Sequence, residues 1–193
     1  PSWCSALGGN MSQPSPVYSN VSIALHWTIA LLVFGQIGLV MAHDVTHGSD
    51  MSRTLLNLHK SGGLLILALT LVRIGWRFKE PMIALPAEMP GWEKLLARGT
   101  QIGFYLVLIG LPLGGWAASS AAARDISFYG LFNWPLLPIG GGRDAARQFI
   151  EMHELGAKAL YVLLFLHIAG ALKHQFIDKD NILRRMLPFI RPR

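Results

Sequence analysis

Four histidines of this sequence fall inside long apolar stretches, where polar side chains are costly and are candidates for function. They are His26, His59, His153 and His167. The last two share one stretch, MHELGAKALYVLLFLHIAGALKHQF (152–176), and are 14 residues apart. On an α-helix this interval is a rise of about 21 Å and leaves both rings within about 40° of one face. His174 follows seven residues later on the same face. Rings at two depths on one face are what two stacked cofactors would require.

The elements that would position these rings are predicted to be membrane-spanning helices. The chain has 193 residues, of which 52% are hydrophobic and 15% charged, whereas about a quarter are charged in ordinary soluble domains. Apolar runs of about 20 residues can cross hydrocarbon as helices. The sequence therefore predicts an all-α integral membrane four-helix bundle, in which Pro112 should kink or loosen the third helix. The predicted spans are residues 21–42, 55–76, 98–118 and 152–174.

Lys and Arg are unevenly distributed between the loops, and cytoplasmic loops are the richer ones in membrane proteins. The connection between the second and third spans and the C-terminal tail, with their edges, carry Arg73, Arg77, Lys79, Lys94, Arg98, Lys173, Lys179, Arg184, Arg185, Arg191 and Arg193. The other two loops carry only Arg53, Arg124, Arg143 and Arg147. Both termini are therefore expected in the cytoplasm. The 119–151 connection is expected in the periplasm, with Tyr129, Phe132 and Trp134 suited to the membrane interface.

Composition indicates the domain limits, the possible cysteine chemistry and the class of partner. Residues 1–17, rich in Ser, Gly and Pro, are expected to form a mobile leader, residues 18–188 the transmembrane domain and residues 189–193 a basic tail. Cys4 is the single cysteine, which excludes an intramolecular disulfide and a cysteine-based metal cluster. The net charge of +6 would suit nucleic acid or an anionic membrane, and the hydropathy favours membrane lipid as the partner, with no nucleic acid.

The depths of the four histidines in the predicted bundle define two pairs. The second and fourth spans both enter from the periplasm, so His59 and His153 lie on that side. His26 and His167 lie toward the cytoplasm. Two bis-histidine sites suit two b-type haems, because a low-spin iron takes one imidazole from each side. The irons would then be about 20 Å apart, given the helical rise between the ligands.

Intramembrane histidines can also serve roles that need no haem. A single histidine in a span often forms a hydrogen bond between helices. Zinc requires three or four ligands at one point, whereas these rings occupy two depths. A proton relay would favour carboxylates inside the spans, and Glu154 is at a span end. A haem-free transporter or metal-binding module therefore stays an alternative.

His43 and His47 are four residues apart but fall in a predicted polar loop.

Small residues close to two of the histidines allow two interpretations. Ser61, Gly62 and Gly63 follow His59, and Gly156 follows His153. They could leave room for a flat macrocycle, or they could permit ordinary close packing of helices.

Several motifs together resemble the four-helix bacterial cytochrome b561 family, which is related to the b-type subunits of nickel hydrogenases. The motifs are YSNVSIALHW (18–27), NLHKSGG (57–63), MHELGAKALYVLLFLH (152–167) and HQFIDKDNILRRMLP (174–188). The resemblance implies two b haems bound by the first, second and fourth helices, which points to the same four histidines. It also implies a bacterial inner membrane location and electron exchange with a quinone. One branch of the family is credited with oxidising superoxide at the periplasmic haem.

The sequence departs from the family pattern at the cytoplasmic end. Some members have a histidine near the start of the third helix, where this chain reads RGTQ (98–101). Some have a basic residue where this chain has Asn20. These departures do not affect the four histidines, but they weaken any transfer of substrate-site detail.

Two further groups of residues are candidates for substrate sites. For a quinone at the cytoplasmic end, the candidates are His174, Lys173, Arg184 and Trp27. At the periplasmic end, a cationic rim of Arg53, Lys60 and Lys158 could bind haem propionates or attract superoxide, since positive charge accelerates encounters with a small anion.

The expected function is therefore that of a membrane-bound di-haem cytochrome b. It would transfer electrons one at a time between a periplasmic donor, with superoxide as a candidate, and ubiquinone or a similar membrane quinone. In that case it is an oxidoreductase. Alternatively, it is the electron-transfer subunit or anchor of a periplasmic dehydrogenase or cytochrome partner.

Overall fold

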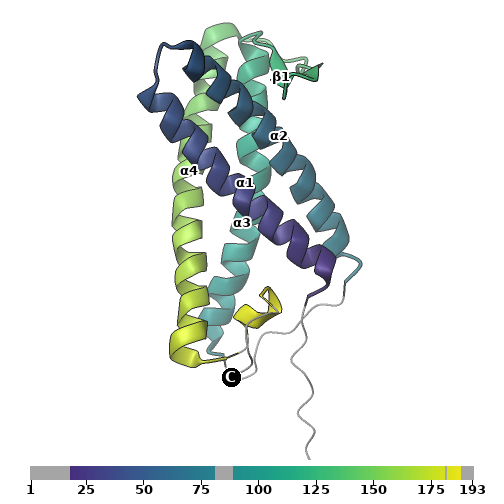
Figure 1. Ribbon diagram of the computed structural model, residues 1–193, viewed down its shortest axis with the longest axis vertical. Helices are drawn as coiled ribbons and strands as arrows, with labels where there is room; N and C mark the ends of the chain where they lie inside the picture. Colours follow the sequence, from purple (N-terminus) through teal and green to yellow (C-terminus); the bar gives the residue numbers. More distant parts are fainter. Residues whose placement is uncertain (1–17, 81–88, 181, 188–193) are drawn as a thin grey trace, which may run out of the picture.

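The computed structural model describes residues 18–80, 89–180 and 182–187. Within them, four long helices cross the molecule from end to end (Figure 1). Each is long and apolar enough to span a membrane. They are α1 (Asn20–Val45), α2 (Asp50–Arg77), α3 (Gly91–Ala121) and α4 (Gly142–Lys173). The chain is thus a membrane four-helix bundle, as expected. The expected leader and the basic C-terminal tail lie outside the described residues.

The helices are longer than the predicted spans because their ends contain polar turns that hydropathy does not detect. The difference is largest in α4, which starts at Gly142 rather than at residue 152. Gly141, with φ 111°, precedes it in a conformation that favours glycine. Ser19 and Ser49 cap α1 and α2 through hydrogen bonds accepted from the backbone amides of Ser22 and Ser52. Pro112 does not interrupt α3.

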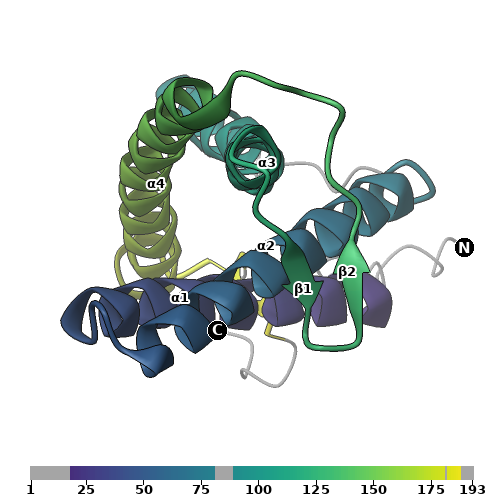
Figure 2. The same ribbon diagram turned by 90° about the horizontal axis from the view of Figure 1, so that it is seen from above.

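The helices pack as two pairs, α1 with α2 and α3 with α4, and α2 joins the pairs by packing on α3 (Figure 2). Ile29, Val33, Ile66 and Leu160 form a buried cluster. Leu160 is seven residues from both His153 and His167, so this cluster lies between the two histidine depths. Many outward apolar side chains are exposed, as expected for helices that face lipid.

A small β-hairpin covers one end of the bundle and replaces part of the expected 119–151 loop (Figures 1 and 2). Strand β1 (Ile126–Phe128) pairs antiparallel with β2 (Phe132–Trp134). Tyr129 and Gly130 have φ of 50° and 75°, as a tight hairpin turn requires. Ser61 of α2 is fully buried beneath the hairpin. Its hydroxyl lies 2.9 Å from the Ser127 carbonyl and accepts a hydrogen bond from the Tyr129 amide.

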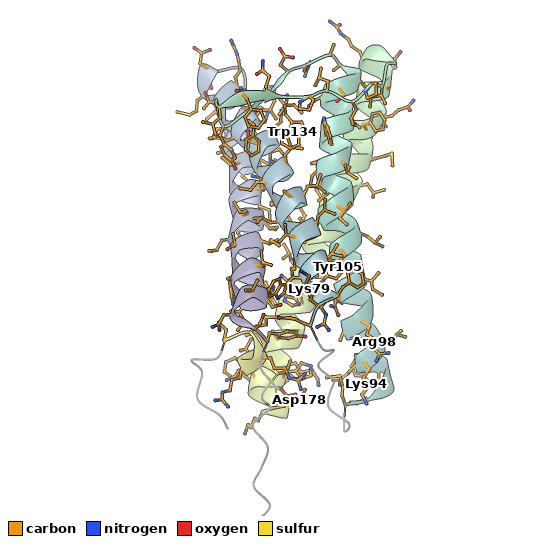
Figure 3. The ribbon with its side chains drawn as sticks, turned by 90° about the vertical axis from the view of Figure 1, so that its right-hand side faces the viewer. Lys79, Lys94, Arg98, Tyr105, Trp134 and Asp178 are labelled. Atoms are coloured by element: carbon orange, nitrogen blue, oxygen red, sulfur yellow. The ribbon has the colours of Figure 1, made fainter. Side chains whose placement is uncertain are left out.

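The opposite end is closed by the chain that follows α4. The α4 helix widens into a π-helix, His174–Asp178, and a 3₁₀ turn, Leu183–Arg185, folds back below the bundle (Figure 1). Trp27 donates its indole N–H to the Met186 carbonyl at 3.0 Å. This end carries the charged residues Lys94, Arg98 and Asp178, whereas Trp134 lies at the hairpin end (Figure 3).

Candidate functional site

The ring of His59 on α2 faces the ring of His153 on α4 near the hairpin end. Their centroids are 6.0 Å apart, with an interplanar angle of 76°. A metal–imidazole bond is about 2 Å long, so two imidazoles on opposite sides of one metal ion have ring centroids about 6 Å apart. The spacing would therefore allow both rings to bind one iron.

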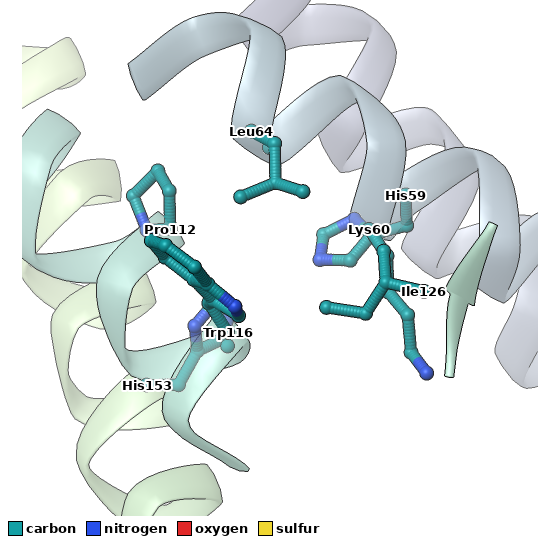
Figure 4. A pocket seen from close by; sticks show the side chains of 9 residues that line it. His59, Lys60, Leu64, Pro112, Trp116, Ile126 and His153 are labelled. Atoms are coloured by element: carbon teal, nitrogen blue, oxygen red, sulfur yellow. The ribbon is translucent and has the colours of Figure 1, made fainter. Parts of the chain in front are cut away.

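Both rings line a cavity at this end of the bundle (Figure 4). Pro112, Gly115 and Trp116 of α3 line it on the side of His153, and Gly63 adds a wall without a side chain. A Cβ added to Gly63 would meet nothing within 4 Å. Lys60, Leu64 and Ile126 complete the lining, so small and flat groups next to the two rings are joined by longer side chains.

The orientation of His153 leaves one specific nitrogen free for a metal. Its Nδ1 lies 2.8 Å from the Leu111 carbonyl of α3. Because a carbonyl only accepts hydrogen bonds, the proton is on Nδ1 and the lone pair is on Nε2. Metal-binding histidines commonly use this arrangement to fix the ring. Sequence reasoning missed Leu111, since a backbone carbonyl on another helix leaves no pattern in the sequence.

The small residues beside the histidines divide between lining the cavity and packing helices. Gly63 lines the cavity. Gly156 instead packs against α3, because an added Cβ would be 2.9 Å from a Leu111 methyl group. Gly62 packs against the side chain of Gln36, and Ser61 holds the hairpin. Gly63 alone among these four lines the cavity.

His26 of α1 and His167 of α4 form the second ring pair, toward the other end of the bundle. Their centroids are 6.1 Å apart, with an interplanar angle of 67°, so the spacing again fits two ligands of one iron. Phe104 and Trp27 pack edge-on against His167 and His26, with centroid distances of 5.4 and 5.3 Å.

Arg73 of α2 is the charged group at this second pair. Its Nη1 lies 3.0 Å from Nδ1 of His26, and a guanidinium only donates, so Nδ1 accepts here. If Nε2 of His26 binds a metal, Nδ1 carries the proton and Arg73 requires another acceptor. A haem offers carboxylates of its own for that purpose, so the residues present remain compatible with a haem.

His43 and His47 contrast with these pairs. Their centroids are 5.9 Å apart, yet the rings follow one another along one segment of chain. His43 lies within α1 rather than in a polar loop, and its Nδ1 is 2.7 Å from the Ser52 hydroxyl. A short distance between two histidine rings therefore indicates a possible shared metal ion only where two different helices supply the rings.

The residues predicted for the quinone site fall into two groups at the closing end. Lys173 and His174 share the carboxylate of Asp178, at 2.7 and 3.1 Å. Trp27 instead donates a hydrogen bond to the carbonyl of Met186, which belongs to the same segment as Arg184. Within the described part of the chain, no hydrogen bond joins His174 to Trp27 or Arg184, and Nε of Arg184 is buried without a hydrogen-bond partner.

The residues predicted for the cationic rim do not form one cluster. Lys60 lines the cavity between His59 and His153. Lys158 is exposed and is not part of that lining, and the exposed Arg53 pairs with Asp50 at 3.4 Å. Arg124, which precedes the hairpin, lies near Lys60 and was not predicted as part of the rim.

Comparison with known proteins identifies similar chains over nearly the whole length. The model of the family described as prokaryotic cytochrome b561 matches residues 17–189. Cytochrome b561 homolog 2 of Escherichia coli is 33% identical over 177 residues, which are 88% of this chain and 90% of that protein. Cytochrome b562 of Cereibacter sphaeroides is 33% identical over 184 residues, 92% and 98% of the two chains. Probable superoxide oxidase CybB of Yersinia pestis is 28% identical over 176 residues, 89% and 96%.

Proposed function

Because this chain belongs to the prokaryotic cytochrome b561 family, we propose that it is a di-haem cytochrome that carries electrons one at a time through the membrane. The observation that carries the proposal is the presence of two histidine pairs with ring centroids 6.0 and 6.1 Å apart. His59 and His153 would hold one haem, and His26 and His167 the other. Bound b-type haem supplies one-electron redox chemistry.

The protein around the two sites would control access and orientation. Each proposed site uses two histidines, which leaves no iron position for a substrate. The buried cluster of Ile29, Val33, Ile66 and Leu160 keeps water out of the region between the pairs. Substrates would therefore exchange electrons at the two ends of the bundle.

At the hairpin end the proposed donor is a small anion, with superoxide as the leading candidate. Lys60 in the cavity wall supplies positive charge beside His59 and His153, and Arg124 and Asp125 lie near Lys60. Positive charge accelerates the approach of an anion. A relative that covers nearly the same length is named a probable superoxide oxidase, which supports this choice.

At the opposite end the proposed acceptor is a membrane quinone. His174 would supply a hydrogen bond to it, with Lys173, Arg184 and Trp27 at the same end of the molecule. The excess of Lys and Arg at this end supports its placement in the cytoplasm, with the hairpin in the periplasm. Two superoxide ions, one quinone and two protons would give two dioxygen molecules and one quinol.

The test is to mix the oxidised, haem-loaded protein with superoxide in the presence of a soluble quinone. The proposal predicts rapid haem reduction followed by quinol formation, with two superoxide ions consumed per quinol. Haem that superoxide does not reduce, but that a co-purifying periplasmic protein does, would contradict superoxide as donor and favour an electron-transfer subunit.

A further inference from the structure

The end of α4 departs from regular helix geometry and brings two carboxylates to the ring of His174. Residues His174–Asp178 form a π-helix, and Lys179 then takes a positive φ of 54°. The Asp180 amide donates back to the His174 carbonyl at 3.2 Å. In a continued α-helix, residues six apart would point to different faces. The reversal at Lys179 instead places Asp180 beside His174.

Both carboxylates approach the same ring nitrogen. Nδ1 of His174 is 2.8 Å from Oδ2 of Asp180 and 3.1 Å from Oδ2 of Asp178. The other oxygen of Asp180 accepts the Ile182 amide at 3.0 Å, which fixes this carboxylate in place. Nδ1 therefore carries a proton, and Nε2 is the nitrogen left for another partner. The His174 side chain is 15% exposed, so the ring is largely shielded from solvent.

The charged groups around the ring of His174 are mostly carboxylates. Lys173 lies 2.7 Å from Asp178 and 3.0 Å from Glu93 of α3. The groups facing His174 are thus three carboxylates and one ammonium group, which leaves excess negative charge beside the ring. Glu93, His174 and Asp178 also lie close enough to share a metal ion. The ammonium group of Lys173 already pairs with both of those carboxylates, so no metal ion is required to balance their charge.

From this geometry we infer that Asp180, assisted by Asp178, holds His174 as the proton donor for quinone reduction. The inference rests on the quinone site proposed above. A quinone takes up two electrons and two protons; the electrons arrive from the donor, one proton passes from Nε2–H of His174 to the quinone oxygen that it contacts, and water supplies the proton of the other oxygen. The ring then regains its proton from water at this end of the molecule. Asp180 is a positioning residue, because it acts through His174 and stabilises the charged ring.

The test compares two acceptors in stopped-flow experiments on haem-loaded protein that has been reduced beforehand. A soluble quinone requires protons, whereas ferricyanide accepts an electron alone. For Asp180→Asn we expect oxidation by quinone to slow by at least about 10-fold, with its pH–rate profile moved to lower pH. Oxidation by ferricyanide and the haem content should match the wild type.

Two further variants complete the test. Asp180→Glu keeps the carboxylate and should recover much of the quinone rate. Glu151→Gln, in an exposed pair with Arg147 at the other end, is the matched control and should behave as the wild type. Equal slowing with both acceptors, or an unchanged quinone rate and pH profile in Asp180→Asn, would overturn the role of Asp180. A wild-type protein that ferricyanide oxidises but quinone does not would overturn the quinone site itself.

Discussion

At the scale of single residues, the partner of each Nδ1 atom distinguishes the histidines of this protein. Nδ1 of His153 is bound to a backbone carbonyl, that of His26 to the guanidinium of Arg73 and that of His174 to carboxylates. A carbonyl fixes a neutral ligand ring, a carboxylate supports a ring that donates protons, and a guanidinium places a fixed positive charge at the site. These contacts therefore distinguish His174 from the two proposed haem ligands, His153 and His26.

The ring pairs predict which variants should have the same effect. His59→Ala and His153→Ala should each remove the haem proposed for the hairpin end, because a haem bound by one histidine would be held more weakly. His26→Ala and His167→Ala should each remove the other haem. Redox titration of the remaining haem identifies which one is lost. Loss of the same haem from His26→Ala and His59→Ala would show that the pairing is wrong.

Arg73 should raise the reduction potential of the haem that His26 and His167 are proposed to hold. A nearby positive charge favours the reduced iron, which carries one positive charge less. Arg73→Gln should therefore lower that potential by tens of millivolts and leave the other haem unchanged, as measured by redox titration. Arg98→Gln, an exposed residue at the same end, is the control. Equal potentials in Arg73→Gln and the wild type would rule out this electrostatic role.

At the scale of elements, the β-hairpin depends on Ser61 of α2. The Ser61 hydroxyl is fully buried and is the hydrogen-bond acceptor for the Tyr129 amide. Ser61→Ala would leave that amide without this partner, at a cost of about 1–3 kcal/mol. We expect a lower melting temperature and faster hydrogen exchange at Tyr129. Thr54→Ala, which removes an exposed hydroxyl from the same helix, should change neither.

Glu80 joins the ends of α1 and α2 and should make their packing sensitive to acid. Hydrogen bonds from Ser19, Ser22 and Trp76 lower the pKa of Glu80 from its ordinary value of 4.5. The ionised carboxylate therefore stabilises the fold above pH 4.5, and this contribution is lost as the pH falls through the lowered pKa.

Thermal unfolding in detergent between neutral pH and pH 3 measures this contribution. Glu80→Gln should lower the melting temperature at neutral pH, and the difference from the wild type should shrink on acidification. Glu151→Gln, whose side chain is 60% exposed, should show no such convergence. A constant difference between Glu80→Gln and the wild type at all pH values would contradict this role.

The sequence predicted the helices and the ring pairs because both depend on regular geometry. Apolar runs reveal spans, and a fixed helical rise converts the positions of His59 and His153 into a common depth. Polar helix ends, such as the first turns of α4, carry no hydropathy signal. The contacts of His153 with Leu111 and of His174 with Asp180 depend on a backbone carbonyl and a π-helix, which no residue pattern specified.

At the scale of the whole molecule, the bundle separates two chemically different ends. The hairpin end has the cavity between His59 and His153, with Lys60 in its wall. The closing end has the ionic cluster around His174. The buried cluster that contains Leu160 lies between the two histidine pairs. This division suits a membrane electron-transfer protein of the cytochrome b561 family.

A haem count combined with a redox titration of the purified wild-type protein tests both haem sites at once. We expect two b-type haems per chain, resolved as two one-electron steps with different potentials. Both should have the spectra of low-spin iron, because each proposed site supplies two histidine ligands. A single haem per chain, or a high-spin haem with an open iron position, would contradict the assignment of His26, His59, His153 and His167.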